Sequence, residues 1–362
     1  MLKSILLTTS FSLISLGSWA QVDSVRASTL PPDQQAEKFY NSGVAKFNQK
    51  SYQDALQDFD RALTLRPSFA KAFYNRATTR YELKDYQPAM QDYNEALRLD
   101  PTSGTAYFGR AQAYEALKQP TEAEQDYTKA VGANATYAPA WYYRGALRFE
   151  KAEYAAAKAD FDQAIKADPT YAYAWHDRGS AQRQLNNYAA AIQDYTKALA
   201  LQPELLPALL NRAGTKRRAG DLKGALQDYA DYLQKKQDNP TAYTNRGAAR
   251  YESGDYKGAA EDFGRAVEMD ATYAFAWNNR AAANLKLGDY KKAGADASKA
   301  ITLNPQYAEA YLNRGHAREM LRQADEACQD WRQAAALGLP VGNDYAAAAG
   351  CAGSAAEGPA AK

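Results

Sequence analysis

Side chains suited to holding a ligand recur along this chain at intervals of 34 residues or multiples of 34. One series is asparagine, whose amide carries both a donor and an acceptor and can therefore grip a peptide backbone without reading its sequence. A second series, one residue earlier, consists mainly of rings that suit the apolar side chains of an extended ligand. The candidate binding residues are Asn41, Asn75, Asn211, Asn245, Asn279 and Asn313 in the first series and Tyr40, Tyr74, Phe108, Tyr142 and His176 in the second, with Tyr173 three residues before His176.

Both series also allow a simpler interpretation. The asparagines could be solvated polar residues of an exposed surface, and the rings could pack between neighbouring helices. The sequence leaves these alternatives open. We expect the rings to stand outside the main packing core, because other aromatic positions of the same interval fill that core.

Catalytic side chains are scarce. The chain has two histidines, His176 and His316, which lie far apart and next to no recognisable nucleophile. It has no GxSxG, P-loop, HExxH or CxxC motif. We therefore predict no enzyme, no cofactor and no metal site.

The interval of 34 is a structural repeat. Prolines stand at 67, 101, 169, 203 and 305, separated by multiples of 34. With Pro67 as position 32, nine repeats run without insertion or deletion from Ala36 to about residue 341. Each holds two apolar stripes at helical spacing with a polar break between them, which predicts a helical hairpin. One hairpin cannot bury both of its faces, so neighbouring hairpins must stack.

The pattern resembles the tetratricopeptide repeat family: position 4 is large, position 8 is small, position 20 is alanine and position 24 is a ring in eight repeats. The resemblance implies an all-α fold, an α-solenoid or right-handed superhelix of nine hairpins whose first helices line a concave groove. The expected repeats are 36–69, 70–103, 104–137, 138–171, 172–205, 206–239, 240–273, 274–307 and 308–341. The exception at position 24, Ala297, predicts a looser stack in the eighth repeat.

A charged pattern accompanies the repeat. Position 7 is arginine in eight repeats, with Ser42 in the first, and position 23 is aspartate in all nine. The two sets are expected to pair, either within a repeat or between neighbouring repeats, because partly buried charges need partners. We interpret the pairs as architectural rather than as a polyanion site, since the acids match the bases.

Both ends of the chain differ from the repeats. Residues 1–20 have the basic start, apolar stretch and small-residue cleavage site of a signal peptide. We expect a flexible leader over 21–35, with Asp33 as a helix N-cap, a capping helix within 342–351 and a disordered tail over 352–362. In an oxidising compartment, Cys328 and Cys351 are expected to form a disulfide.

Composition limits the class of partner. The 44 basic and 42 acidic residues nearly cancel, which argues against nucleic-acid binding. We predict an exported protein, periplasmic or secreted, with no membrane span after signal cleavage. Its expected function is a non-catalytic scaffold that binds an extended polypeptide or an envelope protein in the groove. Recognition of an envelope glycan, such as peptidoglycan, by the same rings and asparagines is the alternative.

Overall fold

The computed structural model describes residues 30–351, so the expected signal peptide, most of the leader and the tail lie outside the described part. Every regular element in this part is an α-helix. In chain order the helices are α2 (Pro32–Asn48), α3 (Tyr52–Leu65), α4 (Ala70–Glu82), α5 (Tyr86–Leu99), α6 (Gly104–Ala116), α7 (Pro120–Ala133), α8 (Ala138–Glu150), α9 (Tyr154–Ala167), α10 (Ala172–Gln184), α11 (Tyr188–Leu201), α12 (Leu206–Arg218), α13 (Leu222–Lys235), α14 (Pro240–Glu252), α15 (Tyr256–Met269), α16 (Ala274–Lys286), α17 (Tyr290–Leu303), α18 (Ala308–Met320), α19 (Ala324–Ala336) and α20 (Val341–Ala348).

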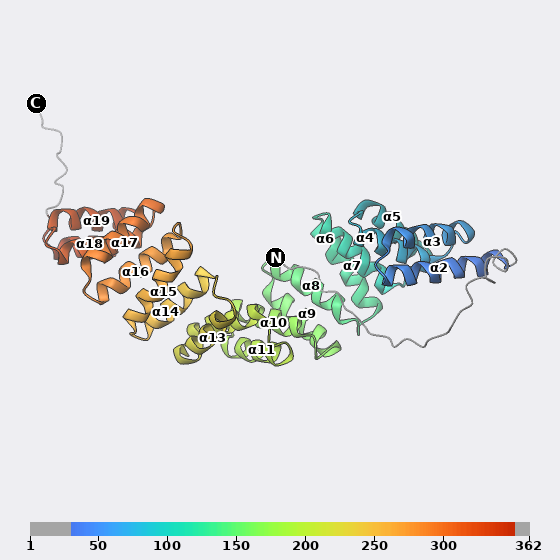
Figure 1. The fold of residues 1–362 in the computed structure, drawn as a ribbon, viewed down its shortest axis with the longest axis horizontal. Coiled ribbons are helices and arrows are strands. Elements are labelled where there is room, and N and C mark those ends of the chain that lie inside the picture. The colour runs from blue at the N-terminus through green and yellow to red at the C-terminus, as the bar shows by residue number, and fades with distance from the viewer. Residues whose placement is uncertain (1–29, 352–362) are drawn as a thin grey trace, which may run out of the picture. The chain divides into compact units, whose positions relative to one another are not determined.

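The helices form stacked hairpins in an all-α solenoid arrangement, as the sequence predicts. The chain divides into two compact units, residues 1–140 and 141–362. Within each unit an even-numbered helix packs against the odd-numbered helix that follows it, and that helix packs against the next even-numbered one (Figure 1). The even-numbered helices α2 to α18 are the first helices of the hairpins.

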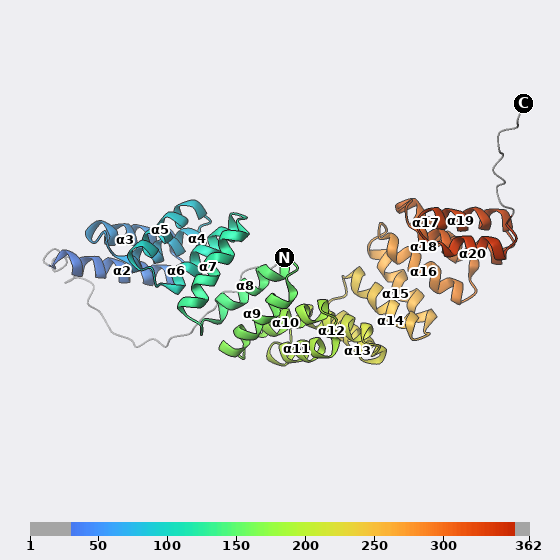
Figure 2. The same cartoon turned by 180° about the vertical axis from the view of Figure 1, so that it is seen from behind.

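First helices also contact the first helices of neighbouring hairpins. This holds for α2, α4 and α6 in one unit and for α10 through α18 in the other. No comparably extensive contact joins successive second helices in the described part. The first helices therefore line the tighter side of each stack, which we call the inner face; Figure 2 shows the same hairpins from behind.

Small residues allow the two helices of a hairpin to approach each other. A Cβ added to Gly43 would lie 2.7 Å from the ring of Phe59, and one added to Gly315 would lie 2.5 Å from Trp331. Both rings are almost fully buried. Burying a large side chain contributes roughly 1.5–3 kcal/mol, so the pairing of small and aromatic positions holds each hairpin closed.

The arginines and aspartates pair within a hairpin. In each of the eight hairpins that have the arginine, its Nε and Nη2 donate to the two carboxylate oxygens at 2.5–3.0 Å. In the first hairpin, Ser42 Oγ and Lys46 Nζ approach Asp58 instead, each at 2.6 Å. The aspartates are buried, so loss of their partners would leave an uncompensated charge that costs about 3–5 kcal/mol.

Helix α2 begins earlier than the leader was expected to end. It starts at Pro32, so residues 32–35 are helical, and Asp33 lies in the first turn rather than at the N-cap. Proline is favoured at this position because its fixed φ suits a helix and its missing N–H is not needed in the first turn. The prediction of a flexible segment up to residue 35 is therefore wrong over its last four residues.

The looser stack expected at Ala297 is also wrong. Helices α16 and α18 make more extensive contact than α12 with α14 or α14 with α16. A Cβ added to Gly294 would lie 3.6 Å from that of Ala317, and Asn313 Nδ2 donates to Asn278 Oδ1 at 2.8 Å. Small side chains let the next hairpin move in and close the space that a ring would fill.

The C-terminal helix α20 is fastened to the last hairpin. Cys328 and Cys351 form a disulfide, with their Cα atoms 5.7 Å apart. Ala346 joins the core around Trp331, and a Cβ on Gly342 would lie 2.2 Å from the Trp331 carbonyl oxygen. The glycine is therefore required for the close approach of α20 to α19.

Candidate binding face on the first helices

The rings expected in a groove lie against the cores of their own hairpins. The Tyr40 centroid is 4.9 Å from that of Phe69, and Tyr142 is only 3% exposed, with its centroid 4.8 Å from that of Tyr171. Tyr74, Phe108 and His176 stack within 5.6–6.1 Å of Tyr93, Tyr127 and Tyr195. The expectation that these rings stand outside the core is wrong, because each lies over the buried ring at position 24 and gains burial there.

The same rings leave only edges for a ligand. Tyr40, Tyr74, Phe108 and His176 are partly exposed, as is Tyr173, which packs against the buried cluster around Tyr195. Burial raises the pKa of Tyr142, with a further contribution from the Asp177 carboxylate, to which its hydroxyl donates at 2.8 Å. Tyr142 therefore acts as a link between repeats rather than as an open surface.

Hydrogen bonds join the ring position of one hairpin to the asparagine position of the next. Asn75 Nδ2 donates to Tyr40 Oη at 2.9 Å, and Asn211 Nδ2 lies 3.0 Å from His176 Nε2. The Tyr142–Asp177 bond occupies the same pair of positions. Asn75 and Asn211 thus each use a side-chain N–H in a hydrogen bond within the protein, and Asn313 does so with Asn278.

The bonds around His176 define the role of its ring. With the Asn211 amide donating, Nε2 of His176 accepts and Nδ1 carries the proton. That proton points to Asp177 Oδ1 at 2.7 Å. The imidazole is thereby held between Asp177 of its own helix and Asn211 of the next first helix, and links the two repeats.

Three asparagines keep their amides open. Within residues 30–351, Asn41, Asn245 and Asn279 make no side-chain hydrogen bond, and each is at least partly exposed. Asn245 and Asn279 lie on successive first helices, α14 and α16. Their donors and acceptors are the part of the predicted row that is free to bind a polypeptide backbone.

A hollow of about 410 Å³ opens on this part of the inner face. It lies between α14, α16 and α18, and Asn279 is one helical turn from Ala282 on its wall. Met320 on its rim is 53% exposed. The lining residues are Tyr251, Ala282, Leu285, Lys286, Tyr290, Asn313, His316, Glu319 and Met320.

Sequence reasoning missed most of this hollow. Of its lining residues only Asn313 was expected to bind a ligand. Tyr290 stands at a repeat position that is tyrosine in most repeats, which indicates packing rather than binding. The remaining lining residues occupy positions that vary from repeat to repeat, so periodicity carries no signal for them. Their departure from the other repeats could have served as a signal, because His316 and Met320 stand at positions where the other repeats have different residue types.

His316 connects the hollow to the C-terminal helix. Its ring lies edge-on to Tyr345, with centroids 4.4 Å apart, and 5.7 Å from Trp331. Burial lowers the pKa of His316, and Glu319 opposes this shift. The imidazole is therefore neutral at pH 7 and presents a hydrogen-bonding group to the hollow.

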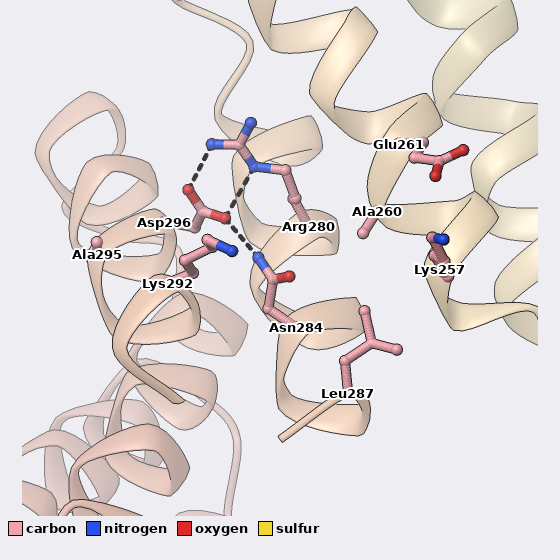
Figure 3. A pocket seen from close by; sticks show the side chains of 9 residues that line it. All are labelled: Lys257, Ala260, Glu261, Arg280, Asn284, Leu287, Lys292, Ala295 and Asp296. Atoms are coloured by element: carbon pink, nitrogen blue, oxygen red, sulfur yellow. Dashed lines mark hydrogen bonds and ion pairs between the residues drawn. The ribbon is translucent and has the colours of Figure 1, made fainter. Parts of the chain in front are cut away.

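A second hollow, of about 510 Å³, lies between α15, α16 and α17 (Figure 3). Asn284 on its wall donates to Asp296 at 3.0 Å, at the position where six other hairpins have an arginine or lysine that pairs with the aspartate. The shorter amide leaves space that the longer cation fills elsewhere. Lys257, Lys292 and Glu261 complete the rim with charges of both signs (Figure 3).

Two other classes of site were searched for in the described part of the chain. Residues 30–351 contain no cluster of three or more His, Cys, Asp or Glu side chains that could hold a metal ion. No helix between these residues has the length and apolar character needed to cross a membrane.

Comparison with known proteins identifies the repeat. Models described as "Tetratricopeptide repeat" match residues 70–103, 92–125, 138–171, 172–205, 210–274, 274–307 and 297–329. No curated protein sequence matches the chain.

Several solved structures are similar to parts of this chain at low identity. A tetratricopeptide repeat protein from Parabacteroides merdae is 19% identical, covers 69% of this chain and 99% of its own, and has a TM-score of 0.48. YrrB, described as a TPR protein with an unusual peptide-binding site, is 23% identical over 53% of this chain and 97% of its own, with a TM-score of 0.45. Yeast Tom70 is 16% identical over 88% and 96%, with a TM-score of 0.43.

Proposed function

Because the chain belongs to the tetratricopeptide repeat family, we propose that it is a non-catalytic scaffold that binds an extended polypeptide, such as a segment of an envelope protein, along its inner face. The repeat family supplies the stacked first helices that form such a face. The open amides of Asn245 and Asn279, on two of the first helices that border the hollow, are the observation that carries the proposal.

These groups suit a polypeptide for a chemical reason. An extended backbone presents alternating N–H and C=O groups, and a side-chain amide matches one of each. Asn245 and Asn279 repeat this offer once per hairpin. The hollow next to them, lined by Leu285 and Met320, can take an apolar side chain of the same segment.

We further propose that the protein acts outside the cytoplasm, in a periplasm or as a secreted protein. The signal-peptide pattern of residues 1–20 supports export, although it lies outside the described part of the chain. The Cys328–Cys351 disulfide is consistent with an oxidising compartment.

The alternative ligand is an envelope glycan. It retains one specific support, the rings of Tyr251 and Tyr290 that line the hollow and could stack on a sugar. The rings of repeats one to five offer less than the sequence suggested, since they are packed against their hairpins. We therefore favour the polypeptide.

The test uses the chain from Gln21 to Lys362 and an unfolded, reduced and alkylated model polypeptide. Replacing Asn245 and Asn279 by Ala should weaken binding by about tenfold or more, because each lost hydrogen bond contributes about 0.5–1.5 kcal/mol. Asn343→Ala, an exposed asparagine on α20, is the matched control and should change nothing. Fluorescence anisotropy measures the affinities.

Two results would contradict the proposal. One is unchanged affinity of the Asn245→Ala, Asn279→Ala variant for the polypeptide. The other is displacement of the bound polypeptide by a chito-oligosaccharide with direct saturable binding of the sugar, which would favour the glycan.

A further inference from the structure

The charge on the inner face changes sign in repeats five and six. The last turn of α10 carries Arg183, and the last turn of α12 carries Arg217 and Arg218. We call these three residues the basic cluster. At the equivalent positions of other first helices stand glutamates, namely Glu82, Glu115, Glu150, Glu252 and Glu319.

The helix dipole does not explain the basic cluster. A cation in the last turn of a helix is favoured by the partial negative charge there. Five other first helices nevertheless end in glutamate at the same positions, so the fold imposes no such preference. The arginines of repeats five and six need another explanation.

Little of the positive charge is compensated within the protein. Lys216, next to the cluster, spends its ammonium on Asp228 at 2.9 Å. Arg217 Nη1 lies 3.5 Å from Glu252, whose side chain is 47% exposed. Arg183 and Arg218 make no ion pair within residues 30–351. The cluster therefore presents guanidinium groups that are available to an incoming anion.

A phenol hydroxyl lies beside the cluster. In other hairpins the buried tyrosine at this position bonds a side chain of the first helix: Tyr93 lies 3.2 Å from Thr78 Oγ1, and Tyr195 lies 3.1 Å from Ser180 Oγ. In repeat six the corresponding residue is Gly214, whose added Cβ would lie 3.5 Å from the Tyr229 hydroxyl. Tyr229 consequently makes no side-chain hydrogen bond within the described residues.

Both sides of the cluster act on this hydroxyl. Burial raises the pKa of Tyr229 to about 12; the charges of Arg217 and Arg183 oppose the shift, and those of Glu252 and Asp228 add to it. The two arginines, from successive first helices, are therefore within electrostatic reach of one phenol. At neutral pH the phenol keeps its proton. The tyrosine is only 1% exposed, but its hydroxyl is not among the enclosed side-chain atoms of the described part that lack a partner, so the hydroxyl is the one group of Tyr229 that can donate to an anion.

We propose that the basic cluster, with the Tyr229 hydroxyl, is a subsite for carboxylate side chains of an acidic polypeptide segment. The inference rests on the proposed function and specifies its ligand. A guanidinium matches a carboxylate with two parallel hydrogen bonds, and the phenol adds a third donor. Glu150 on the preceding first helix repels a continuous polyanion, and Glu252 already occupies one side of Arg217, so the subsite suits a short acidic stretch rather than a nucleic acid or a sulfated glycan.

The experiment compares two short labelled peptides of the same sequence, one with an adjacent pair of glutamates and one with glutamines. The wild-type chain should bind the glutamate peptide about tenfold more tightly. Replacing all three cluster arginines by Gln should abolish this preference. The control variant Arg61→Gln, Arg98→Gln, Arg265→Gln removes the same charge from arginine side chains that are 61%, 64% and 67% exposed, and it should keep the preference.

Tyr229→Phe is a second test variant, and it should fold normally because Phe59, Phe161 and Phe263 occupy the same position in other hairpins. It should reduce the preference severalfold without removing it. Equal affinity of the wild type for the two peptides, failure to bind either, or equal loss in the control variant would overturn the inference. So would tighter binding of a sulfated oligosaccharide through the same arginines.

The two proposals fail in different ways. If the unfolded polypeptide binds through Asn245 and Asn279 but the glutamate peptide gains nothing, the scaffold function stands and the acidic subsite falls. If the glutamate preference depends on the cluster while the asparagine variant binds normally, the subsite stands and backbone recognition at the asparagines falls.

Discussion

The inner faces of repeats one to five and of repeats seven to nine share one register but differ in what fills it. In the first group, position 5 holds a ring that packs on the hairpin core, as Tyr142 does. In the second group, position 5 holds Thr244, Asn278 and Leu312, and a hollow opens between the first helices. The comparison teaches that one register accommodates different side chains at position 5, since Thr244 and Asn278 are buried there as Tyr142 is.

The two groups of repeats also differ in the polar contact that the arginine at position 7 makes with the preceding repeat. Arg76 Nη1 reaches back to Asp60 of the preceding repeat at 2.6 Å, and Arg178 reaches Asp162 at 2.7 Å. At the equivalent place before Arg280 stands Gly264, which offers no acceptor. In the described part of the chain, the polar link from this arginine to the preceding repeat is therefore missing between repeats seven and eight.

The largest expected effect comes from removing the ring that closes the earlier face. Tyr142→Ala should lower the free energy of unfolding by about 3–5 kcal/mol, because it deletes a buried ring and its bond to Asp177. Thr244→Ala, at the same position of repeat seven, should cost about 1 kcal/mol, since it loses one hydroxyl bond to Pro240. Urea unfolding followed by circular dichroism measures both, and equal losses would abolish the distinction between the two faces.

The second effect concerns the end of the later group. Reducing the Cys328–Cys351 disulfide, or replacing both cysteines by Ser, should cost about 3 kcal/mol, the value expected for a loop of this length. The loss should be confined to α20 and the last hairpin. Hydrogen exchange should therefore accelerate in residues 308–348 and stay unchanged in α4 and α5; uniform acceleration would show that α20 stabilises more than its neighbour.

The 34-residue register made the helical hairpins predictable, because small and aromatic residues such as Gly43 and Phe59 must meet wherever two helices approach. The sequence did not predict which aspartate pairs with each arginine, because positions 7 and 23 are as consistent with pairing between repeats as with pairing within one repeat. The rings of position 5 misled because an exposed ring and a packed ring have the same sequence pattern. Most of the hollow was not predicted, because apart from Asn313 no residue that lines it was expected to bind a ligand.

The third effect is a dependence of stability on pH that arises from His316 in repeat nine. The pKa of His316 is lowered from 6.5 by burial, so the folded protein favours the neutral imidazole. Stability is then fully present above pH 6.5 and is lost as the pH falls through the lower, native value. Thermal unfolding across this range should show a decline that His316→Gln removes. The comparison is made directly between the pH dependence of the melting temperature in the wild type and in the His316→Gln variant.

The smallest effect would make the later repeats resemble the earlier ones. Gly264→Asp places a carboxylate where a Cβ would lie 3.7 Å from Arg280 Nη1, which restores the link that Asp60 gives Arg76. We expect a gain of about 1 kcal/mol, part of it from replacing glycine inside helix α15. Gly264→Ala gives the helix contribution alone, so the difference between the variants measures the ion pair and should shrink at high salt. If Gly264→Asp stabilises the protein no more than Gly264→Ala, the missing acceptor has no effect on how the later repeats are joined. If it stabilises the protein more, a weaker affinity of the Gly264→Asp variant for the unfolded polypeptide would link this contact to binding.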